Sequence, residues 1–224
     1  MPQMDVIIEV LDARIPYSSE NPMVATLREG KPVIKILNKA EIKQEYREHA
    51  LEHRKNRLTD ESDFERVVDV FFENYDGENN KIVALYWPIK KEFDTRFLMD
   101  ELVGRDFKVV LPIVQKDKRE MIFKEWTHDC EMKANQFGIL EPQEGNTYLP
   151  DIILAPLLAY DQKGNRLGYG RGHYDNTVAA IRAEKEVQYI GVGYEDQAVL
   201  FDLPTEEHDI RLEYLLTPDG VKEF

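Results

Sequence analysis

The sequence contains little cysteine, an excess of acidic over basic charge and no long apolar run. Cys130 is its single cysteine, so an intrachain disulfide is excluded and a reducing, cytoplasmic setting is expected. The five histidines and Cys130 show no spacing typical of a zinc site. The longest apolar stretch, residues 152–160, is interrupted by Pro156 and is far shorter than the roughly 20 residues that span a membrane. The N-terminal apolar run includes acidic residues and has no basic leader, so we expect neither a signal peptide nor a membrane span.

The charge balance restricts the partners. The chain has 43 acidic against 29 basic residues, a net charge of −14, which disfavours binding to nucleic acid or to an anionic membrane. One local basic pocket for a small anion remains compatible with this charge. Hydrophobic residues make up 42% of the 224 residues, which is sufficient for one core. We therefore expect one domain, with or without a small extra piece.

Strands and helices are predicted to alternate along the chain, which indicates an α/β protein. Residues 1–41 are predicted to form a βαβ unit, with strands over 4–12 and 33–37 and a helix that starts at Asn21-Pro22 and ends by Gly30. The composition shifts near residue 41. Residues 42–224 are predicted to form a three-layer α/β/α sandwich with a largely parallel or mixed central sheet. Its predicted helices are 43–58, 61–75, 94–103 and 174–185; its predicted strands are 81–87, 108–114, 120–126, 151–155, 188–193 and 212–217, with a loop over 127–150 and a hairpin near 161–165.

The most informative segment is RLGYGRGHYD, residues 166–175. Its alternate glycines allow backbone amides to turn inward toward a polyphosphate, and the helix that follows adds its partial positive charge. Arg166 and Arg171 could supply cationic donors, and Asp175 an oxygen ligand for Mg²⁺. The spacing matches neither the dinucleotide fingerprint nor the P-loop. A flexible glycine turn with solvated charges is an equally good interpretation of the loop composition alone.

Weaker signals lie elsewhere. Lys43, Arg47 and Arg54 share one helix face and could hold phosphates, although a solvated face that pairs with nearby glutamates is the better interpretation in isolation. Asp209 lies in a polar turn before the last predicted strand, where ligands of α/β sheets often bind. Three large aromatic side chains near strand ends could stack on a heterocycle or simply fill the core: Trp87, Trp126 and Tyr160.

Residues 150–175, PDIILAPLLAYDQKGNRLGYGRGHYD, resemble the signature of the 5-formyltetrahydrofolate cyclo-ligase family. Four further blocks resemble the same family in the same order: residues 43–54, 86–95, 121–142 and 204–217. The resemblance covers about residues 42–224. Agreement of five ordered blocks is far more specific than any one of them.

The resemblance implies a set of site residues. ATP would be bound by Lys43, Arg47, Arg166, Leu167, Gly168, Tyr169, Gly170, Arg171, Gly172, His173 and Tyr174. The folate substrate would be bound by Trp87, Glu92, Trp126 and residues Tyr169, Gly170, Arg171, Gly172 and His173. Arg166 and Arg171 would act in catalysis, and Asp175 and Asp209 would hold Mg²⁺. Two positions depart from the usual family pattern: His173 replaces a tyrosine and Glu213 replaces a common aspartate.

The implied reaction is the ATP-dependent cyclisation of 5-formyltetrahydrofolate to 5,10-methenyltetrahydrofolate by a monomer, with release of ADP and phosphate. In the family mechanism ATP first phosphorylates the formyl oxygen, and N10 of the folate then attacks the activated carbon. Phosphoryl transfer needs positioning and charge neutralisation rather than a nucleophilic side chain. This requirement fits a sequence in which we identify no convincing Ser-His or Cys-His arrangement.

Residues 1–41 resemble something else, the opening of circularly permuted GTPases of the ribosome-assembly type. Asn38-Lys39-Ala40-Glu41 would be the guanine-reading motif, with glutamate in place of the final aspartate. The sequence downstream contains no P-loop, so we interpret this piece as a fused remnant. Two alternatives to the enzyme therefore stay open: a GTP-dependent ribosome-assembly factor, and a non-catalytic module that binds folate or nucleotide.

Overall fold

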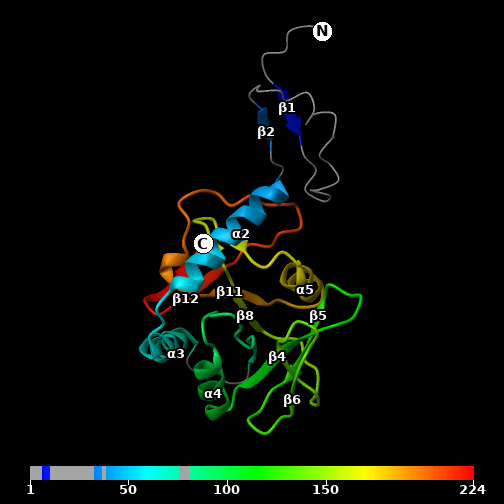
Figure 1. Ribbon diagram of the computed structural model, residues 1–224. Coiled ribbons are helices and arrows are strands. Elements are labelled where there is room, and N and C mark those ends of the chain that lie inside the picture. Colours follow the sequence, from blue (N-terminus) through cyan, green and yellow to red (C-terminus); the bar gives the residue numbers. More distant parts are fainter. Residues whose placement is uncertain (1–6, 11–32, 37–38, 76–80) are drawn as a thin grey trace. The chain divides into compact units, whose positions relative to one another are not determined.

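The computed structural model describes residues 7–10, 33–36, 39–75 and 81–224 (Figure 1). The chain divides into two units, residues 1–49 and 50–224, which are described separately.

The first unit contains β1 (Ile7–Val10) and β2 (Val33–Ile36), which pair in parallel with Ile7 opposite Val33. Parallel pairing requires a crossover connection, as the predicted βαβ unit has. The helix predicted after Asn21-Pro22 lies outside the described residues. Helix α2 (Lys39–Asn56) begins in this unit, and its C-terminal part belongs to the second. The predicted boundary at residue 41 therefore falls within a helix, and the assignment of two domains stays a prediction.

The second unit alternates strands and helices, as the sequence predicts. Its helices are α3 (Glu61–Tyr75), α4 (Arg96–Gly104) and α5 (His173–Arg182), with a 3-10 turn at Glu195–Gln197. Its strands are β3 (Ile82–Ala84), β4 (Lys108–Val114), β5 (Met121–Glu125), β6 (Met132–Ala134), β7 (Leu140–Pro142), β8 (Ile152–Pro156), β9 (Ala159–Tyr160), β10 (Arg166–Leu167), β11 (Gln188–Val192), β12 (Tyr214–Thr217) and β13 (Gly220–Glu223). Within the described part of the chain, each helix is too short or too polar to cross a lipid bilayer.

Seven strands form one sheet in the order β13-β12-β11-β8-β3-β4-β5. The neighbours from β12 to β4 are parallel, whereas β13 and β5 pair antiparallel at the two edges. The prediction of a largely parallel or mixed sheet is therefore confirmed. β9 and β10 form the predicted hairpin. The loop predicted over 127–150 is wrong in part, because β6 and β7 pair within it, and β13 was not predicted.

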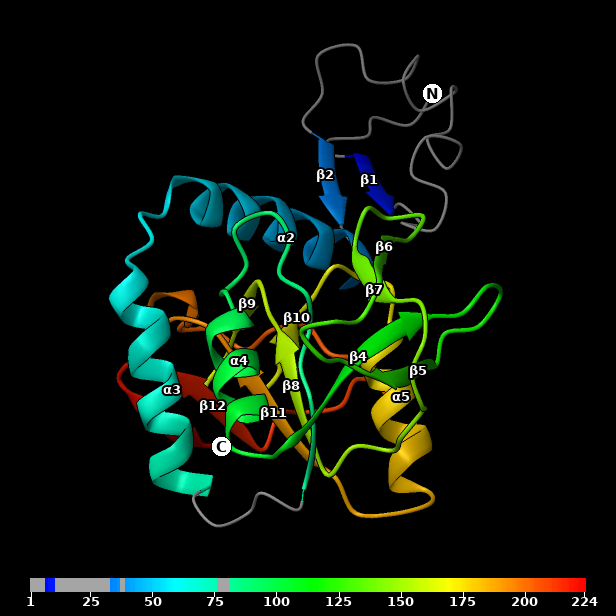
Figure 2. The ribbon, with the colours of Figure 1, turned by 90° about the horizontal axis from the view of Figure 1, so that it is seen from below.

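The two faces of the sheet are buried under different helices, which gives the predicted three layers. On β8, Ile152 and Leu154 point into a core that α3 and α4 cover, while Ile153 and Ala155 point into a second core under α5. All four side chains are fully buried, since a strand with helices on both faces has no solvent side. Figures 1 and 2 show α3 and α4 together on one side of the sheet and α5 on the other.

The sheet order brings three loops to one edge. β11, β8 and β3 are neighbouring parallel strands, so their carboxyl ends lie together. The segments that leave these ends are 85–95, 157–172 and 193–213. The crevice outside the carboxyl ends of such strands is where α/β folds usually bind ligands.

We predict that Leu154→Ala lowers the free energy of unfolding by about 2–5 kcal/mol, because it leaves a cavity on the central strand β8. Denaturant unfolding followed by circular dichroism measures this change. Leu200→Ala is the matched control, because the Leu200 side chain is 90% exposed and its loss should change stability by less than about 0.5 kcal/mol. Equal effects of the two substitutions would contradict this assignment of the core.

Candidate functional site

The glycine-rich segment forms a tight connection between β10 and α5. Gly170 and Gly172 have φ angles of 84° and 70°, in the left-handed region that favours glycine. Gly172 is the N-cap of α5, and its carbonyl oxygen accepts hydrogen bonds from the side-chain amide and the backbone N–H of Asn176 at 2.6 and 3.0 Å. A β-carbon at position 168 would come within 2.9 Å of the Arg166 guanidinium. The glycines therefore allow a backbone path that other residues would strain, directly before a helix N-terminus.

Arg166 is anchored beneath this loop. Its side chain is 8% exposed, and its Nη1 donates to the carbonyl oxygen of Pro156, the last residue of β8, at 3.0 Å. Its Nη2 lies 3.5 Å from Oδ2 of Asp175. Burial alone would lower the pKa of Arg166, but Tyr189 and Asp175 outweigh it and raise the pKa, so the group stays charged. A fixed buried cation thus lies next to the loop.

The structure brings Asp175 and the segment of Asp209 together. Oδ1 of Asp175 accepts a hydrogen bond from the backbone N–H of Ile210 at 3.1 Å, across 35 residues of sequence. Oδ2 of Asp209 accepts from the backbone N–H of Glu206 at 2.8 Å. Arg166 interacts electrostatically with both carboxylates. Carboxylate oxygens are ligands that Mg²⁺ prefers, so the two residues fit the ion. In the described ranges no three His, Cys, Asp or Glu side chains gather as a metal site, so further ligands would come from phosphate oxygens and water.

On the other side of the same loop, Tyr169 and Glu92 both lie next to the Arg54 guanidinium. Glu92 is 7% exposed, and its Oε2 accepts a hydrogen bond from the backbone N–H of Ile89 at 2.9 Å. Its Oε1 lies 3.8 Å from Nη1 of Arg54, and that nitrogen donates to the Tyr169 hydroxyl at 2.9 Å. Burial raises the pKa of Glu92, while the Ile89 amide and Arg54 oppose the rise. Burial raises the pKa of Tyr169 to about 12, so its hydroxyl is protonated at neutral pH.

For Arg54 the favoured prediction of a solvated helix face is wrong. The Arg54 side chain is 4% exposed and contacts residues from two loops. Lys43 and Arg47 lie in the other unit, and their contact with ATP stays a prediction.

The remaining predicted residues lie around the loop or in the core. Trp126 is 7% exposed and packs in the core under α3 and α4, and Trp87 is partly buried against that core, 5.8 Å from the Arg96 guanidinium. The Arg171 guanidinium lies 3.9 Å from the ring of Phe137. Nδ1 of His173 donates to the carbonyl oxygen of Arg119 at 2.7 Å. His173, the departure from the family pattern, thus attaches the start of α5 to the β4–β5 connection.

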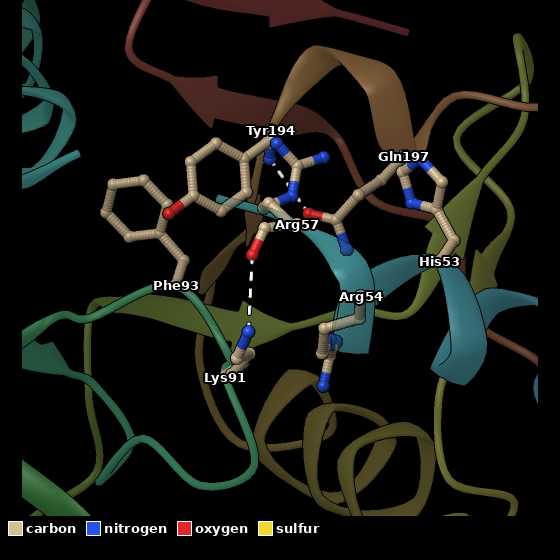
Figure 3. Close-up of a pocket in the computed structure, with 7 residues that line it drawn as sticks. All are labelled: His53, Arg54, Arg57, Lys91, Phe93, Tyr194 and Gln197. Atoms are coloured by element: carbon tan, nitrogen blue, oxygen red, sulfur yellow. Dashed lines mark hydrogen bonds between the residues drawn. The ribbon is translucent and has the colours of Figure 1, made fainter. Parts of the chain in front are cut away.

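A small pocket at the C-terminal end of α2 includes three cationic side chains, Arg54, Arg57 and Lys91, in its lining. Its lining residues are His53, Arg54, Arg57, Lys91, Phe93, Tyr194 and Gln197 (Figure 3). No local pattern of residues indicates this grouping, because its members come from the C-terminal end of α2 and the residue after it, and from the segments after β3 and β11. The Arg57 guanidinium stacks 4.0 Å from the Tyr194 ring and forms an ion pair with Asp196.

Asp161 is a second residue that the sequence reasoning missed. It is 1% exposed in the β9–β10 turn, where its Oδ1 accepts from the backbone N–H groups of Lys163 and Asn165, both at 2.9 Å. Its Oδ2 accepts from the Asn165 side chain at 2.7 Å and from the backbone N–H of Leu203 at 2.9 Å. Asp161 therefore ties the hairpin before the glycine loop to the segment that leads to Asp209. The spacing of Asp161 and Asn165 across the predicted turn is the sequence signal that could have indicated this role, because aspartate and asparagine side chains often bond the backbone of turns.

Comparisons with known proteins agree with this geometry. The model of the 5-formyltetrahydrofolate cyclo-ligase family matches residues 39–218. The chain belongs to this family. Membership of this family makes the protein a ligase. The match confirms the resemblance of residues 42–224 to the cyclo-ligase family. The matched range begins at the first residue of α2.

Individual relatives support the same membership. The 5-formyltetrahydrofolate cyclo-ligase of Haemophilus influenzae is 38% identical over 138 residues, which cover 59% of this chain and 73% of that protein. The Escherichia coli protein of the same name is 32% identical over 148 residues, covering 63% and 80%. The solved structure of a 5,10-methenyltetrahydrofolate synthetase from Aquifex aeolicus is 31% identical, with a TM-score of 0.67 over 81% of this chain and 92% of that one. A synthetase from Mycoplasma pneumoniae, 24% identical over 79% of this chain and 98% of that one, shares the fold with a TM-score of 0.62.

For this member of the family we predict that Asp161→Asn lowers the free energy of unfolding at pH 7 by about 1–3 kcal/mol. An amide nitrogen in place of Oδ2 would face two donors, the Asn165 amide and the Leu203 N–H. Urea unfolding measures the change. Asp202→Asn is the control, because its carboxylate is exposed and forms a surface ion pair with Lys163. Equal stability of the wild type and Asp161→Asn at pH 7 would contradict this anchoring role.

The same variant tests a pH dependence. Burial would raise the pKa of Asp161, but its hydrogen bonds outweigh burial and hold the pKa below the usual range. A lowered folded pKa contributes stability that is present above the unfolded value of about 4 and is lost as pH falls through the folded value. The stability gap between the wild type and Asp161→Asn should therefore shrink below about pH 4.

Proposed function

We propose that this chain catalyses the ATP-dependent cyclisation of 5-formyltetrahydrofolate to 5,10-methenyltetrahydrofolate, with release of ADP and phosphate. The single observation that carries the proposal is the meeting of Asp175, Arg166 and the Ile210 amide beneath the glycine loop, in a member of this family. The relatives named above carry the corresponding activity in their names.

The nucleotide side of the site consists of the loop, its arginines and the start of α5. The loop amides and the N-terminus of α5 present partial positive charge toward a phosphate. Arg166 is held by Pro156 and Asp175, so it offers a charge that needs no reorganisation during phosphoryl transfer. Arg171 would neutralise the transferred group from the loop itself. The phosphate contacts of Lys43 and Arg47, which lie in the first unit, stay a prediction from the sequence.

Mg²⁺ would be held by Asp175 and Asp209, and when bound it would neutralise charge on the phosphate oxygens. Asp175 is suited to this task because Arg166 and the Ile210 amide keep its carboxylate oriented. The Glu206 amide restrains Asp209 in the same way.

The folate side consists of Glu92, Trp87 and the loop residues from Tyr169 to His173. Trp126 is buried in the core under α3 and α4, so its contact with the folate stays a prediction. Glu92 would accept hydrogen bonds from the folate, and Tyr169, 38% exposed, would contact its ring. In the proposed reaction the formyl oxygen attacks the γ-phosphorus and ADP leaves. The N10 lone pair then attacks the formyl carbon, the carbon–oxygen bond breaks, phosphate leaves and the N10 proton is released. The protein positions both substrates and supplies no nucleophile.

We predict that Asp175→Asn lowers kcat/KM for ATP by about 10²-fold or more, because charge facing the phosphates is lost. The asparagine Oδ1 can still accept from the Ile210 amide, so the fold should survive, as circular dichroism would show. The assay follows the near-ultraviolet absorbance of the methenyl product. Asp219→Asn is the control, since Asp219 pairs with Arg66 at the surface. Near-normal turnover by Asp175→Asn would refute the proposed metal role.

The wild-type assay also separates the alternatives. Product formation with ATP but not with GTP would support the cyclo-ligase. Tight GTP binding without this reaction would favour an assembly factor, and folate binding without ATP consumption would favour a non-catalytic module.

A further inference from the structure

Arg54 is a buried cation whose partners come from two different ligand loops. Its Nη2 donates to the carbonyl oxygen of Leu157 at 2.5 Å, directly after β8. Its Nη1 donates to the Tyr169 hydroxyl in the glycine loop and lies 3.8 Å from Glu92 in the loop after β3. Figure 3 shows the Arg54 side chain among the residues that line the pocket, near Lys91. A buried charge is costly unless it is paired and hydrogen-bonded, so these contacts define one position for the guanidinium.

A third loop reaches the same carbonyl group. Nε2 of Gln197, in the segment after β11, donates to the carbonyl oxygens of Leu157 and Leu158 at 2.9 and 3.1 Å. Gln197 is 8% exposed. The carboxyl ends of β3, β8 and β11 are therefore joined through one buried group of polar contacts in which Arg54 is the cation and Glu92 the carboxylate.

The Glu92 loop is also fixed to α2 at a second point. Nζ of Lys91 donates to the carbonyl oxygens of Lys55 and Arg57, at the end of α2, at 2.9 and 3.3 Å. The last carbonyl groups of a helix have no partners within the helix, so a lysine satisfies them well. Lys90 and Lys91 have φ angles of 48° and 59°, a conformation that costs energy outside glycine. This strained turn directly precedes Glu92. It is held by the bonds of Lys91 to the end of α2 and by the bond between the Ile89 N–H and the Glu92 carboxylate.

We propose that Arg54 is a positioning residue that fixes Glu92 and Tyr169 relative to each other, and so aligns the folate with the nucleotide loop. This inference rests on the proposed function, because it assigns Glu92 and Tyr169 to the folate site. The Tyr169 hydroxyl accepts from Arg54, and both groups oppose the rise that burial causes in the pKa of Glu92. Arg54 therefore acts through both residues without contacting the reacting atoms.

The experiment compares Arg54→Met, Arg54→Lys and the control Lys55→Met. Methionine keeps much of the length and removes every donor, whereas lysine keeps the charge beside Glu92. The Lys55 side chain is 76% exposed and forms a surface ion pair with Glu52 at 4.0 Å, so its loss should leave kcat/KM unchanged. We expect Arg54→Met to lower kcat/KM for 5-formyltetrahydrofolate by about 10²-fold, because misplacement of the site by about 1 Å has effects of this size.

A pH profile separates positioning from a merely structural role. Charged and titratable groups that face Glu92 are Arg54 of α2, Lys90 of its own loop, Tyr169 of the glycine loop, Tyr86 after β3 and Tyr174 of α5. Loss of the Arg54 charge should raise the pKa of Glu92, so that Glu92 becomes protonated at a higher pH. As the pH is lowered, the folate affinity measured by calorimetry should therefore begin to weaken at a higher pH in Arg54→Met than in the wild type. Arg54→Lys should restore the wild-type pH profile while kcat/KM stays reduced, because an ammonium group cannot contact Tyr169 and Leu157 as a planar guanidinium does.

Tyr169→Phe supplies a test that does not depend on the stability of Arg54→Met. If Arg54 acts through Tyr169, the effects of Tyr169→Phe and Arg54→Lys on kcat/KM should not be additive in the double variant. Additive effects, or unchanged kcat/KM and pH profile in both Arg54 variants, would overturn the proposal. Wild-type protein that binds the folate without turnover would refute the proposed reaction, while the affinity measurements would still test Arg54. Wild-type protein that binds no folate would refute both.

Discussion

The carboxyl end of β8 is the point on which the site depends, because two buried guanidinium groups bind neighbouring carbonyl oxygens there. Arg166 donates to Pro156 and Arg54 donates to Leu157. Each arginine also contacts a carboxylate, Asp175 for Arg166 and Glu92 for Arg54. Because buried charges need such partners, the strand end fixes both arginines, and each arginine in turn fixes one side of the glycine loop.

The distribution of charge follows from the same arrangement. The chain has a net charge of −14, yet cationic groups gather where the loops meet, at Arg54, Arg57 and Lys91 on one side and Arg166 on the other. Fixed cationic groups within an acidic protein suit small anions better than extended polyanions, which would meet the repulsion of the remaining surface. This distribution fits substrates that carry phosphates and carboxylates, as ATP and folates do.

Rigidity of the loops is supplied by buried carboxylates and amides as much as by arginines. Asp161 accepts four hydrogen bonds and joins the β9–β10 turn to Leu203, and Gln197 joins the segment after β11 to the end of β8. Each satisfied buried group limits the conformations that its loop can adopt. Catalysis by positioning requires such restraint, because the proposed reaction uses no nucleophilic side chain and depends on the alignment of two bound substrates.

The alternation of strands and helices, the mixed sheet, the family and the glycine loop could be predicted from the amino-acid sequence, because periodic apolar residues and glycine spacing are local signals. Strands β6, β7 and β13 were not predicted, because their short runs of residues carry weak periodicity. The burial of Arg54 and the hydrogen bond between Asp175 and the Ile210 amide follow from the three-dimensional fold and could not be predicted from the sequence. These contacts join residues 35 to 115 positions apart, so burial and partners depend on how the strands are ordered in the sheet, which no local pattern encodes.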